Sequence, residues 1–160
     1  MIIEINDINL PELDIFARLS ENELRHYYEP NGGLFIAESP NVIERALNAG
    51  CIPVSMLIDK ADVGNSETKR IIDIIEGKDK TEKNIDTGVG ITKQEDIGTI
   101  NIYAADKTVL KALTGFPMTM GMLCAFSRPM PKTVEEICAK ASRIAVLEDV
   151  MNPANIGAIF

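Results

Sequence analysis

The sequence lacks the groups of histidine and cysteine that usually bind metals or act as nucleophiles. It contains one histidine, His26, and three widely spaced cysteines, Cys51, Cys124 and Cys138, none of them in a C-x-x-C pair. This number and spacing fit a reducing compartment and argue against a disulfide framework or a zinc site. We expect Cys124 and Cys138 to be small buried apolar side chains, and His26 to be solvated or hydrogen-bonded rather than a general base.

Long apolar runs and phosphate-binding loops are absent as well. No stretch approaches the roughly 20 apolar residues that are needed to span a bilayer. The opening M-I-I-E-I-N-D has neither the basic nor the apolar region of a secretion signal. The sequence contains no glycine-rich phosphate loop, nucleophile elbow or metal-ligand cluster. We therefore expect a cytoplasmic protein with no membrane partner and no bound metal.

The overall composition is that of a globular protein with an excess of negative charge. The 160 residues are 46% hydrophobic and 25% charged, with a net charge of −8. That length fits one domain, or one domain and a piece of another. The net charge alone argues against a nucleic-acid partner, because such binders usually carry a basic surface.

The charge is unevenly distributed along the chain. Residues 1–59 hold three arginines against ten carboxylates, whereas residues 98–128 hold Lys107, Lys111 and Arg128 against Asp106 alone. If the protein binds RNA, we expect these three basic residues, and not the N-terminal third of the chain, to contribute to the contact.

Short apolar runs alternate with amphipathic helical patterns between residues 33 and 128. Four such runs predict strands, and three cap-like residues followed by apolar stripes predict helices, each ended by a glycine. This alternation predicts an α/β fold with a mainly parallel sheet, helices on both faces and right-handed crossovers. The expected strands are 34–37, 54–58, 99–104 and 122–126; the helices begin at Ser39-Pro40, Ser66 and Asp106 and end at Gly50, Gly77 and Gly115.

The segments that flank this pattern are of a different kind. Residues 1–32 predict a lead-in, in which 1–10 form a frayed strand or an arm and two short helices cover 11–19 and the stretch from Ser20. Residues 78–98 are charged and aperiodic, which fits a functional loop, disorder or a hidden pair of strands. The prolines at 129–131 predict a stiff linker, and an amphipathic helix is expected over 132–141.

Polar residues gather where two of the expected strands end. Ser39 and Asn41 follow the first strand, and Asp59, Lys60, Asp62 and the stretch 64–66 follow the second. Open α/β sheets bind ligands at this edge, and an exposed hydroxyl or amide at a helix N-terminus suits a phosphate oxygen. Ordinary helix capping explains the same residues, so both interpretations stay open.

The last eighteen residues carry the most specific pattern of the chain. The run 144–147 predicts a buried strand, and Glu148 with Asp149 reads as a turn rather than as an acid–base pair. Asn152-Pro153 predicts a helix N-terminus. Asn155 lies in the first turn beside apolar residues, where an amide is a poor core residue and a good partner for a ribose hydroxyl.

The run V-L-E-D-V-M-N-P-A-N-I-G-A-I-F at 146–160 resembles the first signature motif of the SpoU (TrmH-type) RNA ribose 2′-O-methyltransferases, in the knotted SPOUT superfamily. The shared core is N-x-x-N-x-G. The resemblance implies that Asn155 lies near the reacting ribose and the methyl donor, S-adenosylmethionine. It also implies that an arginine six positions after Asn155, directly beyond Phe160, activates the 2′-hydroxyl. The family's two later motifs, which form the knot and hold the donor, would follow as well.

The resemblance also implies a domain organisation. Residues 33–128 are similar to the three-layer α/β/α substrate-binding domain of SpoU proteins, which is related to a ribosomal protein that binds kinked RNA, although E-G is commoner there than Glu38-Ser39. Residues 132–160 would be the truncated start of the knotted domain. The complete protein would then be a homodimer that methylates rRNA or tRNA. The present chain would be an inactive, monomeric fragment with no bound S-adenosylmethionine.

The residues alone also allow a non-enzymatic α/β module that binds RNA or a small anion. The codons that follow Phe160 distinguish the two hypotheses, since an arginine and further sequence favour the enzyme and a stop codon favours the module. In either case the RNA-binding residues that we predict are Ser39, Asn41, Lys107, Lys111 and Arg128, and the predicted catalytic residue is Asn155.

Overall fold

A computed structural model describes residues 2–17, 23–24, 33–77, 100–130, 132–150 and 153–159. The predictions for His26, for 78–98 and for the cap at Asn152 lie outside these residues. The chain divides into two compact units, Met1–Met130 and Pro131–Phe160. None of the helices in the described ranges has the length and apolar character needed to cross a membrane.

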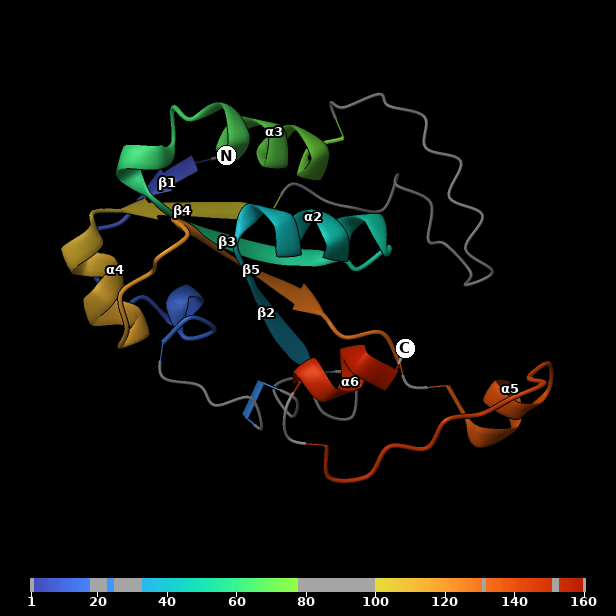
Figure 1. The fold of residues 1–160 in the computed structure, drawn as a ribbon. Helices are drawn as coiled ribbons and strands as arrows, with labels where there is room; N and C mark the ends of the chain where they lie inside the picture. Colours follow the sequence, from blue (N-terminus) through green and yellow to red (C-terminus); the bar gives the residue numbers. More distant parts are fainter. Residues whose placement is uncertain are drawn as a thin grey trace. The chain divides into compact units, whose positions relative to one another are not determined.

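The first unit is built around a five-stranded sheet with the order β1-β4-β3-β5-β2 (Figure 1). The four strands predicted between residues 33 and 128 are confirmed to within a residue or two at each end. One of the two structures expected for residues 1–10 is also found, because an N-terminal strand pairs with β4. The strands are β1 (Ile2–Glu4), β2 (Leu34–Glu38), β3 (Pro53–Asp59), β4 (Asn101–Ala105) and β5 (Met122–Ser127).

The sheet is mixed, which corrects the prediction of a mainly parallel one. β4 runs parallel to both β1 and β3, but β5 runs antiparallel to both β3 and β2. The helix before β5 is only eight residues long, about 12 Å, and Gly115 ends it in the left-handed conformation. Residues 115–121 then return the chain to the edge where β4 ended. A buried apolar run packs equally well in either direction, so its pattern does not encode this reversal.

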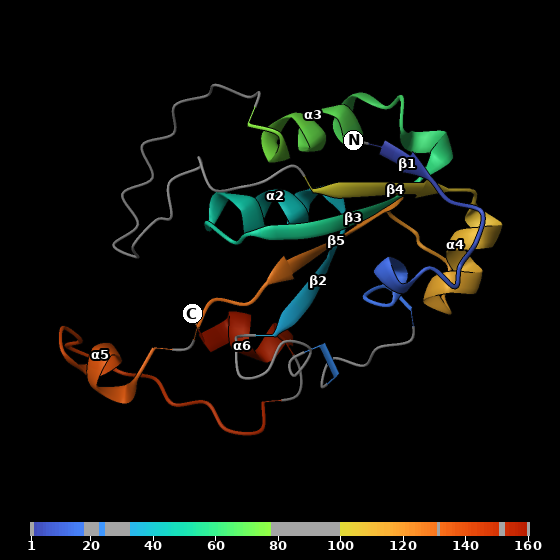
Figure 2. The ribbon, with the colours of Figure 1, turned by 180° about the vertical axis from the view of Figure 1, so that it is seen from behind.

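Helices cover both faces of the sheet (Figures 1 and 2). α2 (Pro40–Asn48) and α3 (Ser66–Ile75) pack through Ile43, Ile71 and Ile75 on the face that carries Met56 and Ile58 of β3. α4 (Lys107–Thr114) packs on the opposite face with Leu110 and Leu113, against Leu57 of β3. The alternation of Met56, Leu57 and Ile58 between the two cores is the two-residue period of a strand.

The N-cap residues of these helices are those predicted, except that the cap of α3 lies one residue earlier. Ser39 caps α2, since its Oγ accepts a hydrogen bond from Val42 N at 3.4 Å. α3 is capped by Asn65 and not by Ser66, because Asn65 Oδ1 accepts from Glu67 N at 3.0 Å. Both residue types are good caps, and sequence alone does not decide between neighbours. Asp106 occupies the N-cap position of α4 without a side-chain hydrogen bond.

The N-terminal lead-in is part of the first unit's core. The predicted helix over 11–19 is wrong in its described part, where a 3₁₀ turn, η1, covers only Pro11–Leu13. Leu13, Ile15, Phe16 and Ala17 are all buried against the face that α4 covers. Side chains buried at nearly consecutive positions need contacts all round the backbone, which a one-sided amphipathic helix does not provide.

The described part of the second unit contains two short helices, and it corrects three predictions. α5 covers only Val134–Cys138 instead of 132–141, with a capping box between Thr133 and Glu136. Cys138 is exposed rather than buried. The run 144–147 forms no strand in the described part of this unit, and Val146 is 86% exposed. A strand needs a neighbour for its N–H and C=O groups, and none is described here. α6 (Pro153–Ile159) begins at the predicted proline.

Candidate functional site

One edge of the sheet collects the polar residues that follow the strands. β1, β2, β3 and β4 all end at this edge, and the reversed strand β5 begins there. The backbone joins these ends, since Asp59 N donates to Gly121 O at 2.8 Å and Ser39 N donates to Met122 O at 3.3 Å. The segments after β2 and β3 therefore face the loop that precedes β5.

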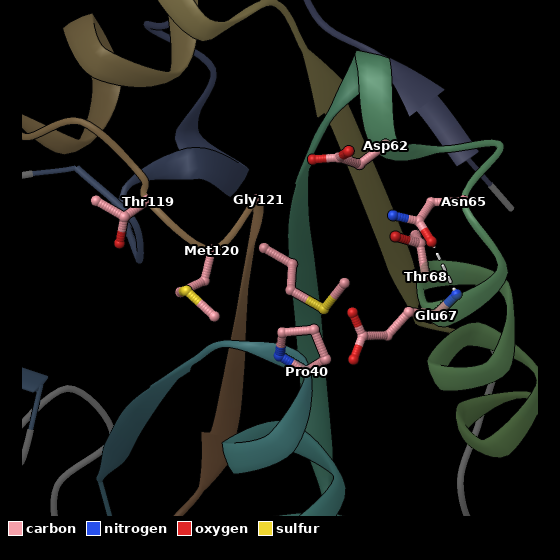
Figure 3. A pocket seen from close by; sticks show the side chains of 9 residues that line it. Pro40, Asp62, Asn65, Glu67, Thr68, Thr119, Met120 and Gly121 are labelled. Atoms are coloured by element: carbon pink, nitrogen blue, oxygen red, sulfur yellow. Dashed lines mark hydrogen bonds between the residues drawn. The ribbon is translucent and has the colours of Figure 1, made fainter.

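A hollow of about 240 Å³ opens at this edge (Figure 3). Three segments form its wall: the start of α2, the stretch from the 3₁₀ turn η2 (Lys60–Asp62) to the first turn of α3, and the loop before β5. Its lining combines acidic and neutral polar side chains with methionine and proline. The lining residues are Pro40, Asp62, Asn65, Glu67, Thr68, Thr119, Met120, Gly121 and Met122.

Gly121 allows the loop to approach the opposite wall of the hollow. Its φ is +72°, and a Cβ built there would collide with Oδ2 of Asp62. Only glycine combines this left-handed backbone with the missing side chain. The position of Asp62 therefore depends on Gly121.

Beside the hollow, a buried carboxylate organises the end of β3. The side chain of Asp59 is only 4% exposed. Its Oδ1 accepts from Ala61 N at 2.9 Å, which caps η2, and its Oδ2 lies 3.7 Å from Nζ of Lys107. At the neighbouring strand end Lys60 donates to Glu4, and this hydrogen bond raises the pKa of the lysine amine.

The structure brings three of the five predicted RNA-binding residues to this edge. Ser39 and the exposed Asn41 lie at the start of α2, and Lys107 lies at the start of α4 with its side chain 81% exposed. Lys111 is exposed one turn further along α4, on the same side of the helix as Lys107. This edge of the sheet therefore presents both positively and negatively charged residues to solvent.

Arg128, the fifth residue, is not part of this group. It follows β5 at the opposite edge, where its Nε donates to Leu34 O at 2.8 Å and its guanidinium lies 5.7 Å from the ring centre of Phe35. Phe35 in turn stacks on Phe126, with the ring centres 5.3 Å apart. These contacts tie Arg128 to the pairing of β2 with β5.

Asn155 lies in α6 of the second unit and is exposed, as are the apolar side chains of Ile156 and Ile159. Glu148 and Asp149 are exposed as well, and the chain bends at Asp149, which has a φ of +52°. No group of three or more acidic, histidine or cysteine side chains that could hold a metal ion occurs in the ranges that the structure describes.

Sequence reasoning missed the acidic hollow. It singled out Asp62 and the stretch 64–66 but not Glu67, Thr68 or the loop before β5. The loop carries one local signal, a glycine directly before a buried apolar run. That signal predicts a turn and gives no indication of which residues the turn meets across the sheet.

Comparison with known proteins adds two findings. No family model matches the chain. The chain is 26% identical over 157 residues to proteins named as uncharacterized tRNA/rRNA methyltransferases of Mycobacterium tuberculosis and Mycobacterium bovis, covering 98% of the chain and 46% of each relative. The chain therefore spans slightly less than half the length of these relatives.

Among solved structures, the chain is similar to an rRNA methyltransferase from Sinorhizobium meliloti. The TM-score is 0.48 with 11% identity, and the similarity covers 80% of this chain and 38% of that one. An AdoMet-bound rRNA methyltransferase from Sinorhizobium meliloti gives the same TM-score and identity, with 37% of that chain covered.

Proposed function

We propose that this chain is the RNA-positioning domain and the first catalytic segment of an S-adenosylmethionine-dependent methyltransferase that acts on a ribose 2′-hydroxyl of rRNA or tRNA. The observation that carries the proposal is the 26% identity over 98% of the chain to proteins named as tRNA/rRNA methyltransferases. Because that similarity covers both units, it includes the N-x-x-N-x-G run at 152–157. The 2′-O position of the methyl group rests on that run.

The two units have different roles in this proposal. The first unit, a layered α/β domain, would hold RNA at the sheet edge through Ser39 and Asn41, with Lys107 and Lys111 contacting phosphates. Arg128 would have a structural role, because its side chain is committed to Leu34 and Phe35.

The second unit would contribute Asn155 to the reaction. Its side-chain amide both donates and accepts hydrogen bonds, and its exposure in α6 leaves it accessible to a ribose. S-adenosylmethionine supplies the methyl group when it is bound. Asn155 would orient the ribose hydroxyl toward that group, and orientation of this kind accounts for a large part of the rate in such reactions.

The remaining parts of the enzyme belong, in this proposal, to the length of the relatives that the present chain does not span. These parts are the arginine that activates the hydroxyl, the donor-binding motifs, the knot and the homodimer interface. The 160 residues by themselves would then be inactive, without bound donor and monomeric. The complete protein would act in the cytoplasm.

The test begins with the codons that follow Phe160. An arginine codon and further sequence to about the length of the relatives are expected, and the complete gene should then be deleted and restored. Mass mapping of rRNA and tRNA should reveal one 2′-O-methyl group that depends on the gene. Asn155→Ala in the complete protein should abolish that group, whereas Asn48→Ala, which changes an exposed asparagine at the end of α2, should leave it unchanged. An unchanged methylation map after deletion would leave only the non-enzymatic binding module.

A further inference from the structure

The hollow at the sheet edge has an entirely acidic or neutral lining. Asp62 and Glu67 are its charged residues, and no lysine or arginine is among the nine residues that line it. Neither carboxylate has a hydrogen bond or ion pair to any other described residue. The arginine next to them along α3, Arg70, makes a bidentate ion pair with Glu44, at 2.7 and 2.9 Å. The lining of the hollow therefore carries a net negative charge.

A hydroxyl at the same place makes no hydrogen bond to a described residue. Thr68 is only 1% exposed, and its hydroxyl makes no hydrogen bond within the described ranges. Thr114, the other buried helical threonine, shows the usual alternative, since its Oγ1 donates to Leu110 O at 3.0 Å. The hydroxyl of Thr68 instead faces the hollow (Figure 3). Within the described ranges the fully buried side-chain atom without a partner is Ser55 Oγ, so the hydroxyl of Thr68 keeps access to the hollow and is available to a group bound there.

The remaining walls suit an aliphatic chain. Met120, Met122 and Pro40 provide apolar surface, and methionine side chains adapt readily to the shape of a bound group. A volume of about 240 Å³ is many times the roughly 10–15 Å³ that one water needs on the same measure. This is enough for a guanidinium or ammonium group with several carbon atoms.

We propose that the hollow binds an organic cation, a guanidinium or primary ammonium group on a short alkyl chain. The carboxylates of Asp62 and Glu67 accept its N–H donors and balance its charge, and Oγ1 of Thr68 accepts a further hydrogen bond. The group comes either from a free amine, such as a polyamine, or from an arginine or lysine side chain of a polypeptide. This inference goes beyond the proposed methyltransferase function and does not depend on it.

The test is an NMR titration of the ¹⁵N-labelled 160-residue chain at low salt. Agmatine and spermidine represent the free amines, and the tripeptide Gly-Arg-Gly represents a polypeptide. We expect saturable shifts at the amides of Asn65, Thr68 and Gly121. Tighter binding of the amines identifies a small molecule as the ligand, and tighter binding of the tripeptide identifies a polypeptide.

Matched variants show whether the site is specific. Asp62→Asn should weaken binding about tenfold, and Thr68→Val, which keeps the shape of the side chain, about threefold. Asp73→Asn is the control, because it removes the same charge from an exposed position of the same helix, and it should change the dissociation constant less than about twofold. Glu67→Gln replaces Asp62→Asn if that variant unfolds.

Four results would overturn the proposal. The first is the absence of shifts at these amides with all three cations. The second is an equal loss of affinity in Asp73→Asn, which would indicate unspecific attraction. The third is equal binding of tetramethylammonium, which has the charge without N–H donors. The fourth is tighter binding of guanosine or inorganic phosphate, which would assign the hollow to RNA.

Discussion

Nζ of Lys107 lies 3.7 Å from Oδ2 of Asp59, so the first residue of α4 meets the last residue of β3. The two partners differ in their surroundings, because the carboxylate is buried and the lysine side chain is largely exposed. The carboxylate also caps η2 through Ala61 N. The structural role of the pair therefore rests on Asp59.

Replacing each partner should show this asymmetry. Asp59→Ala removes the cap and should lower the free energy of unfolding by about 1–2 kcal/mol. Lys107→Met should change it by less than about 0.5 kcal/mol, because solvent screens an exposed charge. Urea denaturation of both variants measures the difference. Equal losses would mean that the ion pair, and not the cap, stabilises this corner.

Replacing Ser39 with glycine should stabilise the folded protein. Its φ of +84° and ψ of +147° lie in a region that is nearly restricted to glycine, and its cap hydrogen bond is long at 3.4 Å. Ser39→Gly should raise the free energy of unfolding by about 1 kcal/mol. Ser39→Ala keeps the strain and loses the cap, so it should lower that free energy. A thermal melt in which glycine and alanine act in the same direction would contradict the strain argument.

Gly121→Ala should be one of the most destabilising changes to a glycine in this chain. It combines an unfavourable positive φ with a collision against the terminal oxygen of Asp62, a side chain that can rotate away, and we expect a loss of about 1–2 kcal/mol. Gly115→Ala is the matched control, since Gly115 has a φ of +82° and open space around it, and it should lose only about 1 kcal/mol. Asp62→Ala added to Gly121→Ala should recover part of the loss.

Substitutions at one edge of the sheet should lower RNA affinity, and a substitution at the opposite edge should lower stability. Lys107→Met with Lys111→Met should weaken RNA binding by the complete protein and reduce its salt dependence, with little change in stability. Arg128→Met should instead lower the free energy of unfolding by about 1–3 kcal/mol, because it removes a charged hydrogen bond to Leu34 O. Filter binding at several salt concentrations and urea denaturation measure the two effects. If Arg128→Met loses RNA affinity without losing stability, Arg128 contacts RNA, as the sequence predicted.

The three cysteines should react in the order of their exposure. Burial raises the pKa of the Cys124 thiol strongly and that of Cys51 more moderately, so less of each is thiolate at pH 8. Iodoacetamide should modify the exposed Cys138 first, then Cys51, and Cys124 only on unfolding. Since the raised pKa of Cys124 belongs to the folded state, its contribution to stability is complete below the unfolded value of 9.0 and is lost as the pH rises above it. Cys124→Ala should reduce that alkaline loss.

The local elements of the first unit followed from the sequence because each is specified by neighbours along the chain. The apolar run at 122–126 predicted β5, and Ser39 and Gly115 marked the start of one helix and the end of another. The run at 144–147 shows the limit of such reasoning. It has the composition of a strand, but a strand forms only where a second one is present to pair with it.

Between residues 33 and 128 the sequence by itself determined where the described strands and helices lie, which faces of them are apolar, and that polar residues follow the strands. Only the tertiary structure decided that β5 runs against its neighbours, that Arg128 lies at the other edge from Lys107, and that Glu67 and Thr68 share a hollow with Gly121. The physical reason is the distance along the chain between the residues that interact. Periodicity and capping act over a few residues, whereas the contact between Asp62 and Gly121 joins distant parts of the chain and exists only when the sheet is assembled.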